Sequence, residues 1–175
     1  MQKIDFPQHY YHCTNPTMLR YCCFYKNVSP KHKEEFMQKT PDNIHYEDTI
    51  PFVPPITEGK VIKVYDGDTI TVAAKLPYPD SPIYRFSVRL NGIDSPEIKA
   101  KSSTEKMLAV NAREALSGRI LNRIVQLKHT STEKYGRLLA DVYLGETNMN
   151  EWMIANKFAV PYDGGTKHRP SEWSD

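Results

Sequence analysis

The chain has 175 residues, of which 39% are hydrophobic and 25% are charged, a composition that is ordinary for a folded domain and argues against global disorder. Its 23 Lys and Arg residues against 21 Asp and Glu residues give a formal net charge of +2, which excludes a histone-like polycation but not a local basic site. No apolar run approaches the ~20 residues of a membrane span, and no signal-like stretch opens the chain. We therefore expect an intracellular protein, most simply a cytoplasmic one.

Residues 1–57 are expected to form an N-terminal accessory segment that ends in a proline-rich linker. The segment contains too many aromatic residues for a solvated tail, and residues 30–37 could form a short helix that begins near Pro30. Pro51, Pro54 and Pro55 favour an extended chain and mark the linker. Packing against the following domain and binding of a protein partner both remain open as roles for this segment.

The three cysteines, Cys13, Cys22 and Cys23, all lie in this segment. An odd number, with two of them adjacent, fits free thiols in a reducing compartment better than a disulfide framework. His9, His12, His32 and His45 raise the alternative of a zinc site, but His9-x-x-His12 followed by Cys22-Cys23 is not the pattern of paired zinc ligands. Buried thiols and surface imidazoles are the preferred interpretation, and zinc stays open.

From residue 58 onward, the pattern changes to short strands in which apolar residues alternate with polar ones. The strands are expected at residues 60–65, 69–73, 84–91, 124–129 and 138–144. An Asp-Gly turn joins the first two as a hairpin. A helix is expected at residues 104–119, with Met107, Leu108, Ala112, Ala115, Leu116 and Ile120 on its buried face, and a short helix at residues 151–156 is expected to be capped by Asn150.

This order of elements predicts an α+β, mainly β, fold. Three strands, a helix, two strands and a short helix make a five-stranded OB-type Greek-key barrel, with a helix between strands 3 and 4 and a short helix after strand 5. The predicted domain spans residues 58–175.

Three stretches concentrate polar residues that a barrel does not need for packing. They are DGDT at residues 66–69, RLNGIDSPE at residues 89–97 and KYGR at residues 134–137. Each alone is explained by a turn, a loop or a solvated strand end. Their coincidence on one small domain indicates a site.

The residue types in these stretches suit the hydrolysis of a phosphodiester. Asp68 and Asp94 offer hard oxygen ligands for Ca²⁺ or Mg²⁺. Arg89 and Arg137 present planar donor pairs that match phosphate oxygens, and Glu97 is a further carboxylate able to act as a base. Together these groups can stabilise the charge of the transition state and activate a water molecule.

The ordered motifs DGDT, RLNGIDSPE and EKYGRLLA resemble those of the staphylococcal nuclease (thermonuclease) family over residues 58–164. The resemblance implies an OB-type barrel and a Ca²⁺ site. It also implies the following roles: Ca²⁺ ligation by Asp68, Asp94 and the main-chain oxygen of Ser95, with Asp66 as a carboxylate beside them; general-base catalysis by Glu97; phosphate binding by Arg89 and Arg137, with Arg137 near the leaving 5′ oxygen; and nucleotide binding by Lys134, Tyr135 and Tyr162.

By this resemblance, the protein is expected to be a metal-dependent endonuclease that cleaves single-stranded DNA and RNA with little sequence specificity and leaves 3′-phosphate ends. The alternative is a catalytically silent OB-fold module that binds nucleic acid or protein. Such a module would be expected to lack an arginine or Glu97, and all of these are present, so the nuclease is favoured.

The C-terminal region departs from the family's prototype, which continues into a long helix. Residues 171–173 allow one helical turn at most. The YDGGTK motif that begins at Tyr162 is similar to short forms encoded by large DNA viruses of eukaryotes, which would act in a host cell. We hypothesise that residues 1–57 cover the surface that the long helix covers elsewhere.

Overall fold

The computed structural model describes residues 40–133, 135–166 and 169–175, and the chain divides into two units, residues 1–50 and 51–175. The described part of the first unit contains one short 3-10 helix, η1 (Tyr46–Asp48). The cysteines, His9, His12, His32 and the helix expected at residues 30–37 lie outside the described residues, whereas His45 lies within them and is exposed. None of the described helices is long and apolar enough to cross a membrane.

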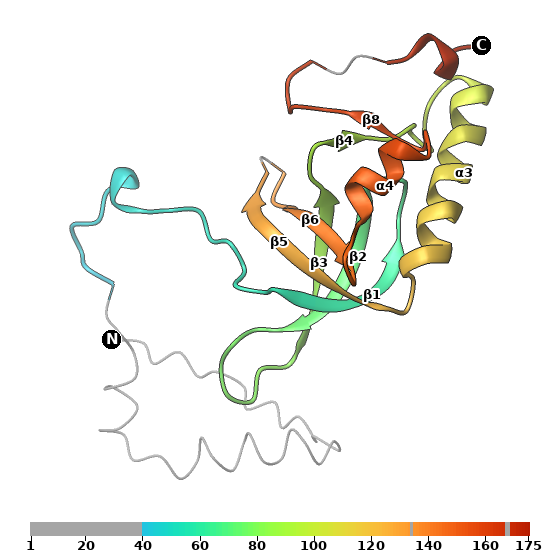
Figure 1. Cartoon of the computed structure of the whole chain (residues 1–175). Helices are drawn as coiled ribbons and strands as arrows, with labels where there is room; N and C mark the ends of the chain where they lie inside the picture. The colour runs from blue at the N-terminus through green and yellow to red at the C-terminus, as the bar shows by residue number, and fades with distance from the viewer. Residues whose placement is uncertain (1–39, 134, 167–168) are drawn as a thin grey trace, which may run out of the picture. The chain divides into compact units, whose positions relative to one another are not determined.

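The second unit is a mainly β domain whose five long strands close into a barrel (Figure 1). The strands are β1 (Glu58–Val64), β2 (Thr69–Lys75), β3 (Ile83–Leu90), β5 (Ile124–Thr132) and β6 (Leu138–Leu144). Neighbours in the order β3-β2-β1-β5-β6 pair antiparallel, and a parallel pairing of β3 with β6 closes the barrel. The expected OB-type fold is confirmed.

Shorter elements complete the domain. β4 (Ile93–Asp94) pairs with β8 (Val160–Pro161), and β7 (Thr147–Asn148) pairs with the end of β6. The two α-helices are α3 (Ser103–Ile120) and α4 (Met149–Ala155). The one helical turn expected near the C-terminus is present as η2 (Ser171–Trp173).

The core forms because alternate residues of each strand point into the barrel. Val61, Val72 and Val88 are fully buried on three neighbouring strands. On α3, the buried positions Ala109, Ala112, Leu116 and Ile120 follow the helical period. The expectation that Met107 is buried is wrong, because its position falls off this stripe and its side chain is 59% exposed.

The cap of α4 also differs from the expectation. Asn148, not Asn150, is the N-cap, since its side chain accepts hydrogen bonds from the main-chain N–H groups of Asn150 and Glu151. The Asn150 side chain is buried and instead donates to the main-chain oxygens of Asn91 and Ala140. It therefore ties β6 to the turn that follows β3.

The C-terminal segment returns to the first turn of α3 (Figure 1). Ser102 caps this helix by accepting a hydrogen bond from the main-chain N–H of Glu105. The Asp175 carboxylate accepts hydrogen bonds from the main-chain N–H groups of Ser103 and Thr104 at 3.1 and 3.0 Å. Trp173 is buried beside them, so this short segment stabilises the start of α3.

Candidate phosphate and cation site

Arg89 lies buried between two carboxylates. Its Nη1 donates to Oδ2 of Asp68 at 2.6 Å, and its Nη2 donates to Oδ1 of Asp94 at 3.3 Å and to the main-chain oxygen of Ile93 at 3.1 Å. The three charged side chains are only 5–10% exposed. Burial alone would lower the pKa of Arg89, but Asp68 and then Asp94 raise it above its ordinary value. The guanidinium is therefore a fixed positive charge.

Strand register brings these residues together. Thr69 pairs with Arg89 across β2 and β3, and the main-chain oxygen of Asp68 accepts a hydrogen bond from the N–H of Leu90 at 2.8 Å. Asp94 follows in β4, after the turn that ends β3. The DGDT loop and the start of RLNGIDSPE are thus parts of one site.

Gly67 allows the DGDT loop to approach its neighbours closely. A Cβ atom at this position would lie 2.8 Å from Cβ of Ser95 and 2.9 Å from Cβ of Ala112, and both distances are too short. Glycine is therefore required here by close packing against the loop after β4 and against α3. The packing holds Asp68 beside the segment that carries Asp94.

The site carries more negative charge than Arg89 neutralises. Burial and the neighbouring Asp68 carboxylate raise the pKa of Asp66 to about 7. The Asp66 side chain also accepts a hydrogen bond from the main-chain N–H of Asp68 at 3.1 Å. A cation beside these carboxylates would relieve the repulsion between them.

The donor set fits a hard cation. Asp68 and Asp94 supply carboxylate oxygens, and the main chain of Ser95, the residue after Asp94, adds a carbonyl oxygen. No group of three or more His, Cys, Asp or Glu side chains that could hold a metal ion is found in the described part of the chain. Two carboxylates completed by water and substrate oxygens are sufficient for Mg²⁺, and Ca²⁺ accepts the same donor types. The Ca²⁺ ligand set stays a prediction.

Arg137 reaches this cluster from the loop between β5 and β6. Its Nη1 donates to Oγ1 of Thr69 at 3.3 Å, and this hydroxyl donates to Oδ1 of Asp68 at 2.8 Å. Its Nε forms an ion pair with Glu133 of the same loop. The two arginines are thus connected through Thr69 and Asp68. Tyr135, on the same loop, is 73% exposed, whereas Lys134 lies outside the described residues.

The Tyr162 ring lies near the Arg89 guanidinium. The Arg89 guanidinium carbon is 5.9 Å from the centre of the Tyr162 ring, and the Tyr162 hydroxyl donates to the main-chain oxygen of Gly165 at 2.8 Å. A cavity of about 420 Å³ opens beside Asp94 and this ring. It is lined by Gly92, Asp94, Val160, Pro161, Tyr162, Asp163 and Thr166. Asp94 and Tyr162 thus border a cavity next to the buried cluster.

Glu97 is exposed on the loop between β4 and α3. Its main-chain N–H donates to Oε1 of Glu105 at 3.2 Å, and Oε2 of Glu105 accepts a hydrogen bond from Arg169 at 3.3 Å. Glu105 is only 2% exposed and fixes this loop, although the sequence analysis did not single it out. The pattern Ser102-x-x-Glu105 could have indicated a role for Glu105. It is typical of a helix-capping box, however, in which the Glu side chain accepts a hydrogen bond from the main-chain N–H of the N-cap residue.

The fold is an OB-type barrel. Its carboxylates and arginines lie at the connections from β1 to β2, from β3 to β4 and from β5 to β6. Residues 87–172 match the family model described as Staphylococcal nuclease homologue. This match includes Arg89, Asp94, Glu97 and Arg137, whereas the DGDT loop precedes it. The resemblance to the staphylococcal nuclease family seen in the sequence is confirmed for residues 87–172, the part of the domain that this match covers.

Three curated proteins illustrate the similarity. A thermonuclease of Staphylococcus hyicus is 34% identical over 94 residues, which are 53% of this chain and 52% of that protein. Protein ParB of Escherichia coli is 36% identical over 86 residues, 49% of this chain and 41% of that protein. A probable endonuclease of Schizosaccharomyces pombe is 25% identical over 152 residues, 79% of this chain and 66% of that protein. The chain thus spans between 41% and 66% of the length of these relatives.

Proposed function

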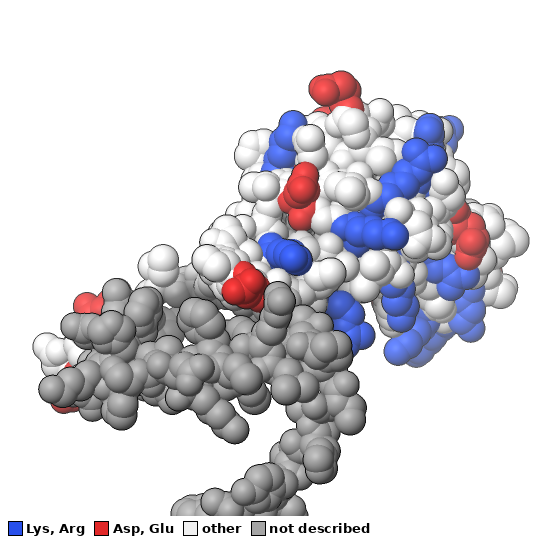
Figure 2. All heavy atoms as spheres, turned by 90° about the horizontal axis from the view of Figure 1, so that it is seen from below, with Lys and Arg blue, Asp and Glu red and all other residues white. Residues whose placement is uncertain are grey.

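We propose that this domain is a metal-dependent nuclease that hydrolyses phosphodiester bonds of single-stranded DNA and RNA with little sequence specificity. The observation that carries the proposal is the continuous set of contacts from Arg137 through Thr69 and Asp68 to Arg89 and Asp94. The names thermonuclease and probable endonuclease of two relatives support it. On the face shown in Figure 2, which is the lower end of the domain in Figure 1 and lies away from β4 and β8, Lys and Arg predominate over Asp and Glu, so this surface favours contact with a polyanion.

In this proposal, Asp68, Asp94 and the main-chain oxygen of Ser95 hold Ca²⁺, with Asp66 adding negative charge beside them. When bound, the ion polarises the phosphate and offsets the charge of the transition state. Arg89 keeps N–H groups beyond those bound to the two carboxylates, so it can donate to a phosphate oxygen without leaving them. The buried cluster thus presents a fixed donor to the scissile phosphate.

Hydrolysis then follows from the remaining residues. Glu97 accepts a proton from water as the water oxygen bonds to phosphorus, and the bond from phosphorus to the 5′ oxygen breaks. Arg137 donates to the phosphate near this leaving oxygen, which takes up a proton from solvent water, while Glu97 returns its proton to solvent and the other product keeps a 3′-phosphate. Lys134, Tyr135 and Tyr162 bind the nucleotide next to the scissile bond.

The test is cleavage of a labelled single-stranded DNA and a matched RNA with Ca²⁺, with Mg²⁺ and with chelator. Glu97→Gln should slow Ca²⁺-dependent cleavage by about 10²- to 10⁴-fold, the usual contribution of a general base. Glu146→Gln, an equal change at an exposed turn after β6, is the control and should cleave as the wild type does. If the folded wild type with Ca²⁺ cleaves neither strand, the nuclease proposal fails and the silent binding module replaces it.

A further inference from the structure

Besides the cavity next to Asp94 and Tyr162, the domain has a groove between β3 and the loop that carries Arg137. We call it the β3 groove. It has a volume of about 210 Å³ and is lined by Phe52, Pro54, Arg85, Phe86, Ser87, Thr132, Gly136 and Leu138. All of these residues belong to the unit formed by residues 51–175. The roles assigned above to the motif residues do not include this groove.

The groove combines the groups that bind one nucleotide. The Phe52 side chain is 69% exposed, so its ring is available to stack on a base. Arg85 is exposed on β3 and forms no ion pair with any described residue, so its guanidinium can bind a phosphate. The hydroxyl groups of Ser87 and Thr132 add hydrogen-bonding capacity. An apolar partner alone would not use the arginine or the hydroxyls.

The groove lies along the strand that carries Arg89 of the candidate site. Arg85, Ser87 and Arg89 alternate along β3 and therefore point to the same side of the sheet. Four residues of strand place Arg85 ~13 Å from Arg89, roughly two nucleotide steps of an extended single strand. On the neighbouring strand, only small side chains oppose them, Ala73, Thr71 and Thr69. On the side of β2, these small side chains thus leave room for a strand of nucleic acid along this face of β3.

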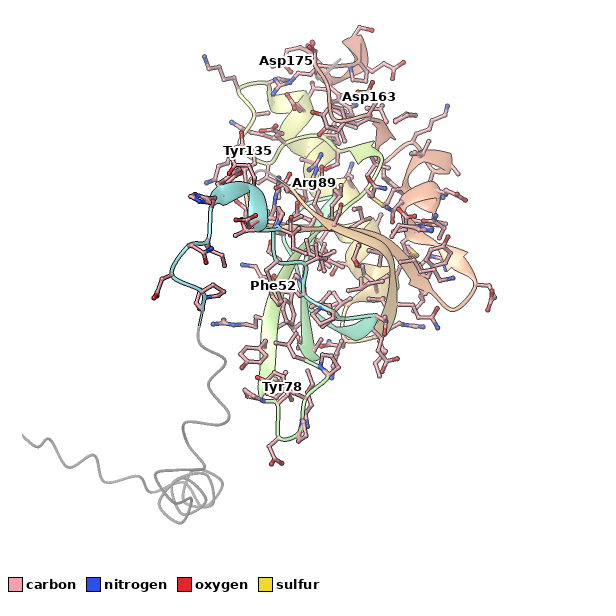
Figure 3. All side chains as sticks on the ribbon, turned by 90° about the vertical axis from the view of Figure 1, so that its left-hand side faces the viewer. Phe52, Tyr78, Arg89, Tyr135, Asp163 and Asp175 are labelled. Atoms are coloured by element: carbon pink, nitrogen blue, oxygen red, sulfur yellow. The ribbon has the colours of Figure 1, made fainter. Side chains whose placement is uncertain are left out.

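The loop between β5 and β6 forms one wall of both regions. Gly136 lines the β3 groove, and the next residue, Arg137, contacts Thr69 in the candidate site. Along the length of the barrel, Phe52 lies farther than Arg89 from the end that carries Tyr135 (Figure 3). The β5–β6 loop therefore borders the candidate site at Arg137 and the β3 groove at Gly136.

We propose that the β3 groove is a second nucleotide subsite, in which a base of the substrate strand stacks on Phe52 and its phosphate binds Arg85. The inference rests on the proposed function, since it names where the strand runs beyond the scissile phosphate. We therefore expect affinity and cleavage efficiency to depend on the length of the substrate. Oligonucleotides long enough to reach the groove should bind more tightly and be cleaved more efficiently than dinucleotides.

The test measures binding and cleavage of a series of single-stranded oligothymidylates from two to twelve nucleotides. Binding is followed by fluorescence anisotropy in chelator at several salt concentrations, and cleavage is followed in Ca²⁺. Phe52→Ala should weaken binding of the twelve-nucleotide strand by about 5- to 100-fold, as for loss of one stacked base. Arg85→Gln should reduce the slope of log affinity against log salt by about 0.7, as for loss of one phosphate contact.

Controls separate these effects from general charge and hydrophobicity. Arg123→Gln removes an exposed arginine at the start of β5, and Ile124→Ala removes an apolar side chain that is 65% exposed. Both should bind the twelve-nucleotide strand as the wild type does. Phe52→Trp should restore the affinity that Phe52→Ala loses, because the larger ring still stacks.

The outcomes distinguish this inference from the proposed function. If the wild type cleaves but Phe52→Ala and Arg85→Gln keep its ratio of twelve-nucleotide to dinucleotide kcat/KM and its salt slope, the subsite is absent while the nuclease stands. If the wild type cleaves no strand, the proposed function fails. The binding series then decides the subsite by itself, since equal affinities of wild type and both variants in chelator would overturn it.

Discussion

The two arginines of the candidate site are held in different ways. Arg89 lies on β3 with a side chain 10% exposed, and three protein oxygens accept its hydrogen bonds. Arg137 lies on a loop with a side chain 30% exposed, and it contacts one carboxylate and one hydroxyl. Arg89 is therefore held in place by the barrel, whereas Arg137 has room to move when a substrate binds. Substitution of Arg89 should therefore affect both folding and catalysis, and substitution of Arg137 catalysis alone.

The largest effect on stability is expected from Arg89→Ala. Removal of the guanidinium leaves Asp68 and Asp94 buried without their partner, which lowers the free energy of unfolding by about 3 kcal/mol or more. Urea unfolding without divalent metal measures the loss. Arg89→Lys should be less destabilised, since it keeps the charge but loses the forked geometry. A variant Arg89→Ala as stable as the wild type would show that the cluster does not support the barrel.

Arg137→Ala is expected to reduce cleavage strongly and stability only slightly. We expect cleavage in Ca²⁺ to fall by about 10²- to 10³-fold, as for loss of one donor to a transition-state oxygen. The free energy of unfolding should change by less than about 1 kcal/mol, because the Glu133 pair is partly exposed. Single-turnover cleavage and urea unfolding on the same preparation test both parts. A stability loss equal to that of Arg89→Ala would break the distinction between the two arginines.

The fold and the site could be predicted from the sequence where they depend on local patterns. The long strands and the helix were predictable, because alternation and helical spacing follow from which side chains face the core. Asp68, Arg89 and Asp94 were predictable as one site, since they are close in sequence or opposite each other across a hairpin. Their assigned roles remain predictions until variants are measured.

Contacts between distant segments were not predictable in this way. The parallel pairing of β3 with β6 depends on closure of the whole sheet, not on a local pattern. Asn150 and Glu105 both resemble helix-terminal residues in sequence, yet each bonds to a distant segment, at Asn91 and Glu97. Phe52 lies in a proline-rich stretch, so no periodicity indicated that it lines a groove with β3.

Gly67→Ala tests how closely the DGDT loop must pack for the buried cluster to form. The added methyl group would meet Ser95 and Ala112, so we expect a loss of about 1–3 kcal/mol in the free energy of unfolding. The matched control is Gly118→Ala on α3, where a Cβ meets nothing within 4 Å and helix propensity should add about 0.5–1 kcal/mol. Opposite signs in urea unfolding would support the packing role, and a stabilised Gly67→Ala would contradict it.

The smallest effect is expected from Asp175→Asn, at the start of the helix that follows the Glu97 loop. The Asp175 side chain accepts hydrogen bonds from Thr104 and Ser103, and these bonds hold its pKa below the usual value of 3.8. Because the pKa is lowered by folding, the stabilisation is complete well above pH 3.8 and is lost progressively as the pH falls below it. The Tm of Asp175→Asn should therefore be slightly lower than that of the wild type at pH 7, and the difference should shrink toward pH 3. Thermal unfolding of both proteins across this range provides the measurement, and a difference that grows on acidification would show that the Asp175 carboxylate does not stabilise the helix that supports the Glu97 loop.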